Sequence, residues 1–295
     1  MKPSGLVAVA LATLVPCGVL AANSPLLIDE LAGARSLAMG GAHRGVGTSN
    51  DTLYLNPAGM AITKRYAIEM QYGYSPWDKS SHLNFSALDS KSGPVAAAAG
   101  YSYDRDDRIA GNAGMSRLYL GGAYAISDGL AFGLTNRYLR GSFIGRDGAA
   151  HKVNAYAGDI GLLASVAGAM VGVTYNNVIG SDFDELTPPT VGLGVGLGNG
   201  MLTLAGDVEI LLREPHARKF VYRGGAEYVV GEGYPLRAGY TRETVIHDDG
   251  TYGPQDFVSL GAGWVSRSGG LDLAYRQALR DRHEWRFVLG LKFFI

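Results

Sequence analysis

The chain has 295 residues, and its 26 basic and 27 acidic side chains leave a net charge of −1. This balance predicts neither a nucleic-acid partner nor a polybasic membrane-surface segment. The 43 glycines, 17 tyrosines and only 18% charged residues are typical neither of a soluble helical protein nor of a disordered one. Because Cys17 is the single cysteine and precedes the expected mature chain, we expect no disulfide, no cysteine-bound metal and no cofactor.

Residues 1–21 have the features of a secretory signal peptide. One lysine precedes an apolar run, and small residues follow at a cleavage-site position after Ala21. Pro16 and Gly18 interrupt the run before it reaches the length of about 20 residues that a membrane helix needs. We therefore expect an exported protein whose mature chain begins at residue 22.

Residues 22–65 lack sustained alternation and contain a glycine-rich stretch, GARSLAMGGAHRGVGTSNDTLYLNPAGMA. The stretch does not fit a phosphate-binding loop, because such a loop ends in Gly-Lys-Ser/Thr between a strand and a helix. Its glycines permit tight turns and close backbone approach. Its larger apolar side chains offer packing contacts, and these are Leu37, Met39, Leu53, Tyr54 and Leu55. We predict that residues 22–65 form an element separate from the rest of the chain.

From Tyr66 onward the sequence alternates apolar and polar residues with a period of two. In the final segment Trp285 and Phe287 lie on one face, and Arg286 and Lys292 lie on the other. We count fourteen such segments, each about as long as a strand that crosses a bilayer at a tilt. They begin near Tyr66, His82, Val95, Met115, Leu130, Val153, Ala169, Thr190, Met201, Arg218, Pro235, Asp256, Leu271 and Glu284.

The connections between these segments alternate in length. Every second connection is a short turn, and these turns are DSKSG, SDG, SVAG, GNG, GEG and SRSGG. The others are mostly longer and more polar, for example GSFIGRDGAAHK. Short periplasmic turns and long outer loops are typical of outer-membrane barrels, and a sheet can cross hydrocarbon only when it is closed. We predict an all-β, 14-stranded antiparallel transmembrane barrel over residues 66–295, in the outer membrane of a Gram-negative bacterium, with both termini in the periplasm.

The inward face of the predicted barrel carries seven acidic and seven basic side chains. Two interpretations fit this balance, an ion-pair network that braces a narrow barrel and a gate that rearranges the pairs. A barrel of fourteen strands lies between small, filled barrels and large porins, so residues 22–65 can occupy its lumen. The inward charges are Glu69, Arg117, Arg137, Asp159, Asp207, Glu209, Arg223, Glu227, Arg237, Asp272, Arg276, Glu284, Arg286 and Lys292.

The stretch ARSLAMGGAHRGVGTSNDTLYLNPAGMA resembles the N-terminal hatch of the FadL-like outer-membrane proteins and of the related PorV-like group. The resemblance rests on AMGGA, on one acidic residue and on NPAG, and it extends along the strands in GDIGLL, GDVE, GGAEY, LRAGY and LDLAYR. It implies a fourteen-stranded barrel with the hatch in its lumen. The candidate gate residues on this basis are Gly40, Gly41, Asp51, Asn56, Pro57, Ala58 and Gly59.

The resemblance implies two functions. FadL-like members pass long-chain fatty acids or aromatic hydrocarbons inward, by a hatch movement and a sideways opening in the wall, whereas PorV-like members serve protein-secretion machinery. The outer loops here are polar and about a dozen residues long at most, unlike the apolar insertions of the fatty-acid channels. We favour a conduit for small hydrophobic molecules. The alternative is an accessory barrel that binds a secretion, motility or surface-assembly protein.

Catalysis is not expected, because no serine and acid stand at a recognisable spacing from the histidines of the outer rim. We interpret these histidines as solvated and expect no metal site; they are His82, His151, His216, His247 and His283. The acidic residues of the outer loops have the same interpretation, and the sharper alternative is that they bind divalent cations bridging lipopolysaccharide, which with membrane lipid would surround the barrel. They are Asp104, Asp106, Asp107, Asp182, Asp184, Glu185, Asp248 and Asp249.

Overall fold

The computed structural model describes residues 33–77, 79–106, 113–144, 150–180, 187–212, 220–246 and 252–295. The expected signal peptide lies outside these ranges, as do His216, His247 and most of the acidic loop residues. Among the described residues, no helix is both long enough and apolar enough to span a membrane.

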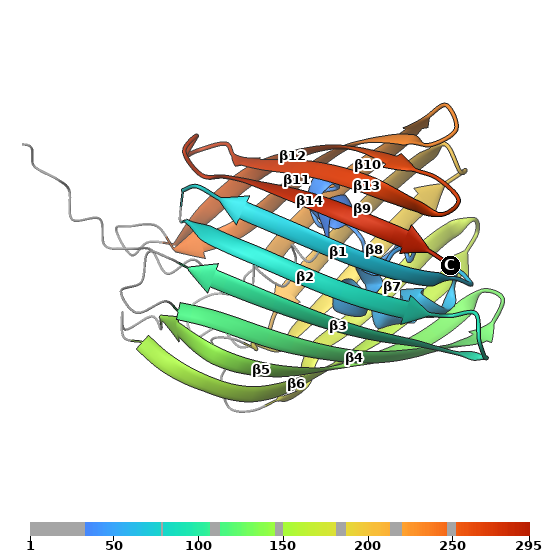
Figure 1. Ribbon diagram of the computed structural model, residues 1–295, viewed down its shortest axis with the longest axis horizontal. Coiled ribbons are helices and arrows are strands. Elements are labelled where there is room, and N and C mark those ends of the chain that lie inside the picture. Colours follow the sequence, from blue (N-terminus) through green and yellow to red (C-terminus); the bar gives the residue numbers. More distant parts are fainter. Residues whose placement is uncertain are drawn as a thin grey trace, which may run out of the picture.

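Within the described ranges, fourteen antiparallel strands close into one barrel (Figure 1). Each strand pairs with its neighbours along the chain, and β1 pairs with β14 to complete the ring. The prediction of the fold class is confirmed. The strands are β1 (Tyr66–Ser75), β2 (Ser80–Asp89), β3 (Val95–Asp106), β4 (Ala113–Ser127), β5 (Leu130–Ile144), β6 (Ala150–Val166), β7 (Ala169–Gly180), β8 (Thr190–Gly198), β9 (Leu202–Leu211), β10 (Phe220–Val230), β11 (Tyr234–Ile246), β12 (Tyr252–Val265), β13 (Gly269–Ala278) and β14 (Trp285–Phe294).

The strands differ from the predicted segments mainly at the end of the barrel that carries the long connections. There β6 begins three residues before the predicted Val153, and it is 17 residues long. A tilted strand needs about 9–11 residues to cross the hydrocarbon, so β6 continues beyond the apolar band. Outside that band neither face must be apolar, and the alternation that marks a strand in the sequence disappears.

The outer surface of the wall is apolar and bounded by aromatic residues. Outward leucines such as Leu120 and Leu273 are about half exposed. Tyr124 and Trp264 stand toward the rim with the short turns, and Tyr138 stands toward the rim with the long connections. Aromatic side chains at both edges of an apolar band are the pattern of a barrel in lipid.

The described part of the N-terminal element, residues 33–65, lies inside the barrel and is called here the lumenal segment (Figure 1, blue). It contains helices α2 (Ala34–Ala38) and α3 (Thr52–Leu55) and the 3₁₀ turn η1 (Pro57–Ala61). Almost every residue from 33 to 61 is buried. The closed wall removes this segment from solvent, so its polar groups must find partners on the inner faces of the strands.

Candidate functional site: the lumenal segment and its two walls

Helix α2 is held to strand β10 by a two-pronged ion pair. The Nε and Nη2 atoms of Arg35 donate to the two carboxylate oxygens of Glu227 at 2.9 and 2.7 Å. The Nη1 atom of the same arginine donates to the carbonyl oxygen of Thr48 at 2.6 Å, which ties α2 to the following loop. This paired geometry fixes both the position and the orientation of the guanidinium.

The pair continues across the inner wall as a chain of alternating charges, called here the Arg35 network. Arg237 on β11 donates to Glu227 and to Asp272 on β13, both at 2.6 Å. Lys292 on β14 lies 2.9 Å from Asp272 and 3.9 Å from Glu69 on β1. Each buried charge therefore faces an opposite charge, which compensates for its lost hydration.

A second cluster, the Arg44 network, anchors the middle of the lumenal segment to β7, β9 and β10. The Nη1 atom of Arg44 lies 3.5 Å from Asp207, and its Nη2 atom bonds Glu209, which also accepts from Arg223 at 3.1 Å. The backbone amides of residues 43 and 44 both donate to Asp207 at 3.0 Å. Burial, reinforced by the charge of Arg35, lowers the pKa of the adjacent His43 side chain to about 4, so this imidazole is neutral at pH 7.

Strand β8 makes room for this anchor with three inward glycines, Gly192, Gly194 and Gly196. A Cβ atom at Gly194 would lie 2.5 Å from Asp207 and 2.7 Å from the Cβ atom of Arg44. A Cβ atom at Gly196 would lie 2.5 Å from the backbone oxygen of residue 45. The motif GLGVGLG thus lets the lumenal segment approach the backbone of the wall.

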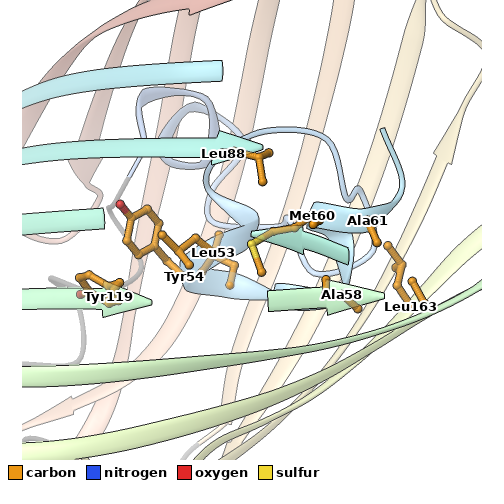
Figure 2. Packing of buried hydrophobic residues seen from close by; sticks show 12 residues of the cluster. Leu53, Tyr54, Ala58, Met60, Ala61, Leu88, Tyr119 and Leu163 are labelled. Atoms are coloured by element: carbon orange, nitrogen blue, oxygen red, sulfur yellow. The ribbon is translucent and has the colours of Figure 1, made fainter. Parts of the chain in front are cut away.

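The other side of the lumenal segment makes an apolar contact with β2–β6, called here the apolar seam (Figure 2). The aromatic rings of Tyr54 and Tyr119 meet edge to face, with centroids 4.7 Å apart. The hydroxyl of Tyr54 bonds to Asn84 at 3.1 Å and is buried with the ring. The seam consists of Leu53, Tyr54, Leu55, Ala58, Met60, Ala61, Leu88, Ala96, Tyr119, Ala123, Ala131 and Leu163.

The NPAG motif forms the start of η1 and seats it on β5 and β6. Asn56 accepts from the amide of Ala58 at 3.2 Å and donates to the carbonyl oxygens of residues 44 and 162 at 2.8 and 3.1 Å. Pro57 rests on a wall glycine, where a Cβ at Gly133 would lie 2.3 Å from its carbonyl carbon. Gly59 faces inward on the segment itself, 2.8 Å from Gly47 as measured from an ideal Cβ.

Gly40, Gly41 and Asp51 belong to the ion-paired side. Both glycines have positive φ angles, 64° and 77°, and a Cβ at Gly40 would lie 2.7 Å from the backbone of Tyr240. The carbonyl oxygen of Gly40 accepts from Thr241 at 2.8 Å. Asp51 accepts from the amide of residue 36 at 3.3 Å, which joins α2 to α3.

The eleven predicted lumen charges are all buried, but they form separate groups rather than one site. Six of them belong to the two networks above together with Glu69, and four lie apart from these networks. Arg137 pairs with Asp159 at 3.1 Å, and Arg276 lies 3.4 Å from Glu243. Arg117 bonds Asp104, a residue that sequence analysis placed in a solvated loop.

The interpretation of Asp104 and His82 as solvated rim residues is wrong. Both are 7% exposed, and His82 Nδ1 lies 2.5 Å from a carboxylate oxygen of Asp104. They sit on β2 and β3, which continue beyond the predicted segments and keep these side chains on the inner face. Arg35 and Arg44 were not predicted as partners of the wall. Two arginines in a stretch otherwise made of small and apolar residues are the signal that could have found them.

No family model and no curated protein matches the chain. Solved structures do resemble it, at low identity. The CymD monoaromatic hydrocarbon channel is 13% identical with a TM-score of 0.68, over 89% of this chain and 97% of that one. The Pseudomonas putida toluene transporter TodX is 15% identical with a TM-score of 0.63, over 89% and 96%.

A Pseudomonas aeruginosa FadL homologue is 10% identical with a TM-score of 0.63, over 88% of this chain and 97% of that one. The resemblance to the PorV-like group gains no support from these structures. The chain has the fold of the FadL-like outer-membrane channels.

Proposed function

We propose that the protein is an outer-membrane conduit for small hydrophobic molecules, in which the lumenal segment acts as a hatch. The observation that carries this proposal is the unequal attachment of the segment to its two walls. Ion pairs hold it to β9–β14, whereas apolar contacts hold it to β2–β6. The related folds belong to proteins named as hydrocarbon channels and a toluene transporter, which supports the same class of cargo.

The apolar seam is the route that a hydrophobic molecule could take at least cost. Removing one partner of a buried ion pair costs roughly 3–5 kcal/mol, because the remaining charge has no hydration and no counter-charge. Parting apolar side chains costs much less when an apolar molecule fills the space between them, since the contacts are replaced in kind. The ion-paired side would then stay in place while the seam opens. Catalysis has no part in this proposal.

The lock that tests this division is a disulfide between α2 and β14. An ideal Cβ at Gly290 lies 3.4 Å from the Cβ of Ala34, close to the 3.5–4.5 Å that disulfides require. We expect the oxidised Ala34→Cys/Gly290→Cys variant to take up a monoaromatic hydrocarbon as fast as its reduced form. A block that appears on oxidation would show that the segment must leave the ion-paired wall.

Truncation at the seam should have the opposite effect. Met60→Ala leaves a cavity among the seam residues and should speed uptake, because the seam then has fewer contacts to break. Leu37→Ala is the matched control, since Leu37 is equally buried but packs on the ion-paired side with Ala274 and Val288. If removing residues 33–61 and both truncations leave uptake equal to that of cells without the barrel, the conduit proposal is refuted.

The placement in the membrane is part of the proposal. The short turns would face the periplasm together with both termini, and the long connections would face outward, as in outer-membrane barrels generally. Protease added to intact cells would then cut only in the long connections.

A further inference from the structure

The outer surface of the barrel carries a groove over β2–β5, near the rim with the short turns. The groove has a volume of about 1000 Å³ and is lined by outward-facing residues of these strands and of β1. Its floor is made of small side chains: Ala97 is paired with Gly122 on β4, and Ala99 with Ala87 on β2. Larger neighbours such as Leu120 stand at its edges.

The groove ends at a rim that holds charges of both signs. Tyr66 and Asp89 line this end. The Nζ atom of Lys91 lies 5.7 Å from the centroid of the Tyr66 ring, and Lys64 reaches the carbonyl oxygen of Gly93 at 3.4 Å. Both lysines are exposed. The apolar groove thus opens next to two ammonium groups and one carboxylate.

We propose that this groove binds one phospholipid of the ethanolamine class, from the leaflet on the short-turn side. An acyl chain would lie over Ala97, Ala99 and Gly122, where the wall is hollow. The phosphate would meet Lys64 and Lys91, and the ammonium of the headgroup would meet Asp89. This inference rests on the membrane placement proposed above, which puts phospholipid at that rim.

Three features favour a lipid over a protein in the groove. The lining is almost wholly apolar up to the rim, as an acyl chain requires, and the charges stand only where a headgroup would be. The barrel is closed, so the strands offer no free edge with which a protein segment could pair. Tyr66 and Tyr124 line the rim end, at the level where aromatic side chains meet headgroups.

The test measures the phospholipid that remains on the barrel after purification in mild detergent, by native mass spectrometry. Ala97→Leu/Ala99→Leu fills the groove, and Ala238→Leu/Ala262→Leu adds the same bulk to exposed outward positions on β11 and β12. We expect wild type and the control to keep one phosphatidylethanolamine and the filled variant to lose it. Lys64→Gln/Lys91→Gln should weaken retention about tenfold.

Exchange with added phosphatidylethanolamine or phosphatidylglycerol identifies the headgroup. Wild type should prefer phosphatidylethanolamine, and Asp89→Asn should lose that preference. Equal retention by the filled variant and its control would overturn the proposal, as would a pair of barrels that separates only when the groove is filled. A barrel that inserts into bilayers and takes up hydrocarbon but keeps no lipid would refute the groove alone, whereas one that never enters the outer membrane would refute the proposed function.

Discussion

The two halves of the inner wall hold the same segment by different means. Strands β9–β14 present carboxylates and cations that enclose Arg35 and Arg44 in fixed geometry. Strands β2–β6 present leucine, alanine and tyrosine to the side chains of α3 and η1. An ion pair is directional and fails completely when its geometry is lost, whereas an apolar contact tolerates sliding and exchange.

This difference separates anchoring from passage. The lumenal segment must stay in the barrel, and the ion-paired wall supplies that attachment without leaving unpaired charge in the lumen. The apolar wall supplies the part that can open. A segment held by ion pairs on both sides would only seal the barrel, and one held by apolar contacts alone would have no fixed seat.

The largest expected effect comes from breaking the ion-paired side at Glu227, which binds both Arg35 and Arg237. Glu227→Gln leaves two buried guanidinium groups without their shared carboxylate, which should cost roughly 3–5 kcal/mol of seating free energy. Trypsin should then cut after Arg35 in the purified barrel. Glu243→Gln is the control, because Glu243 is equally buried near the other rim and pairs with Arg276. Equal protection of the two variants would contradict the anchoring role.

A smaller effect is expected where the wall backbone receives the segment. Gly194→Ala places a methyl group 2.5 Å from Asp207 and 2.7 Å from Arg44, so one of them must shift. Overpacking of this kind costs about 1–3 kcal/mol. Gly224→Ala is the matched control, since a Cβ there meets nothing within 4 Å. A lower melting temperature for Gly194→Ala alone would confirm that the β8 glycines seat the segment.

The sequence was a good guide to which face of the wall a residue occupies. A period of two assigns each side chain to the lumen or to the outside, and this is why the acids and bases of the two networks could be named from the pattern alone. The alternating glycines of GLGVGLG also predicted close approach of the segment, which the contacts of Gly194 with Arg44 confirm.

The sequence was a poor guide to height along the barrel and to partners across the lumen. His82 and Asp104 were assigned to a solvated rim because alternation stops being apolar where strands leave the bilayer, although β2 and β3 continue. The pairs of Arg35 and Arg44 join residues more than 160 positions apart, and no local pattern records such a contact. The outer groove was missed because small outward residues look like ordinary strand positions.

The third prediction concerns pH and applies to the ion-paired side. His43 has a pKa of about 4 in the seated segment, against about 6.5 in a released one. The released form binds more protons between these values, so seating weakens as pH falls from 6.5 toward 4, by about 2 kcal/mol at pH 5. Trypsin protection of Arg44 should therefore decline at pH 5, and His43→Gln should flatten this dependence. A decline that persists unchanged in His43→Gln would assign it to another group.

The smallest effect is expected from the one hydroxyl that the apolar seam contributes through Tyr54. Tyr54→Phe removes its hydrogen bonds with Asn84 but keeps the edge-to-face contact with Tyr119, so seating should weaken by only about 1 kcal/mol. Tyr54→Leu also removes the ring contact and should raise hydrocarbon uptake further than Tyr54→Phe does. If Tyr54→Phe alone released the segment, the seam would depend on a directional polar contact, and the contrast between a fixed wall and a yielding wall would fail.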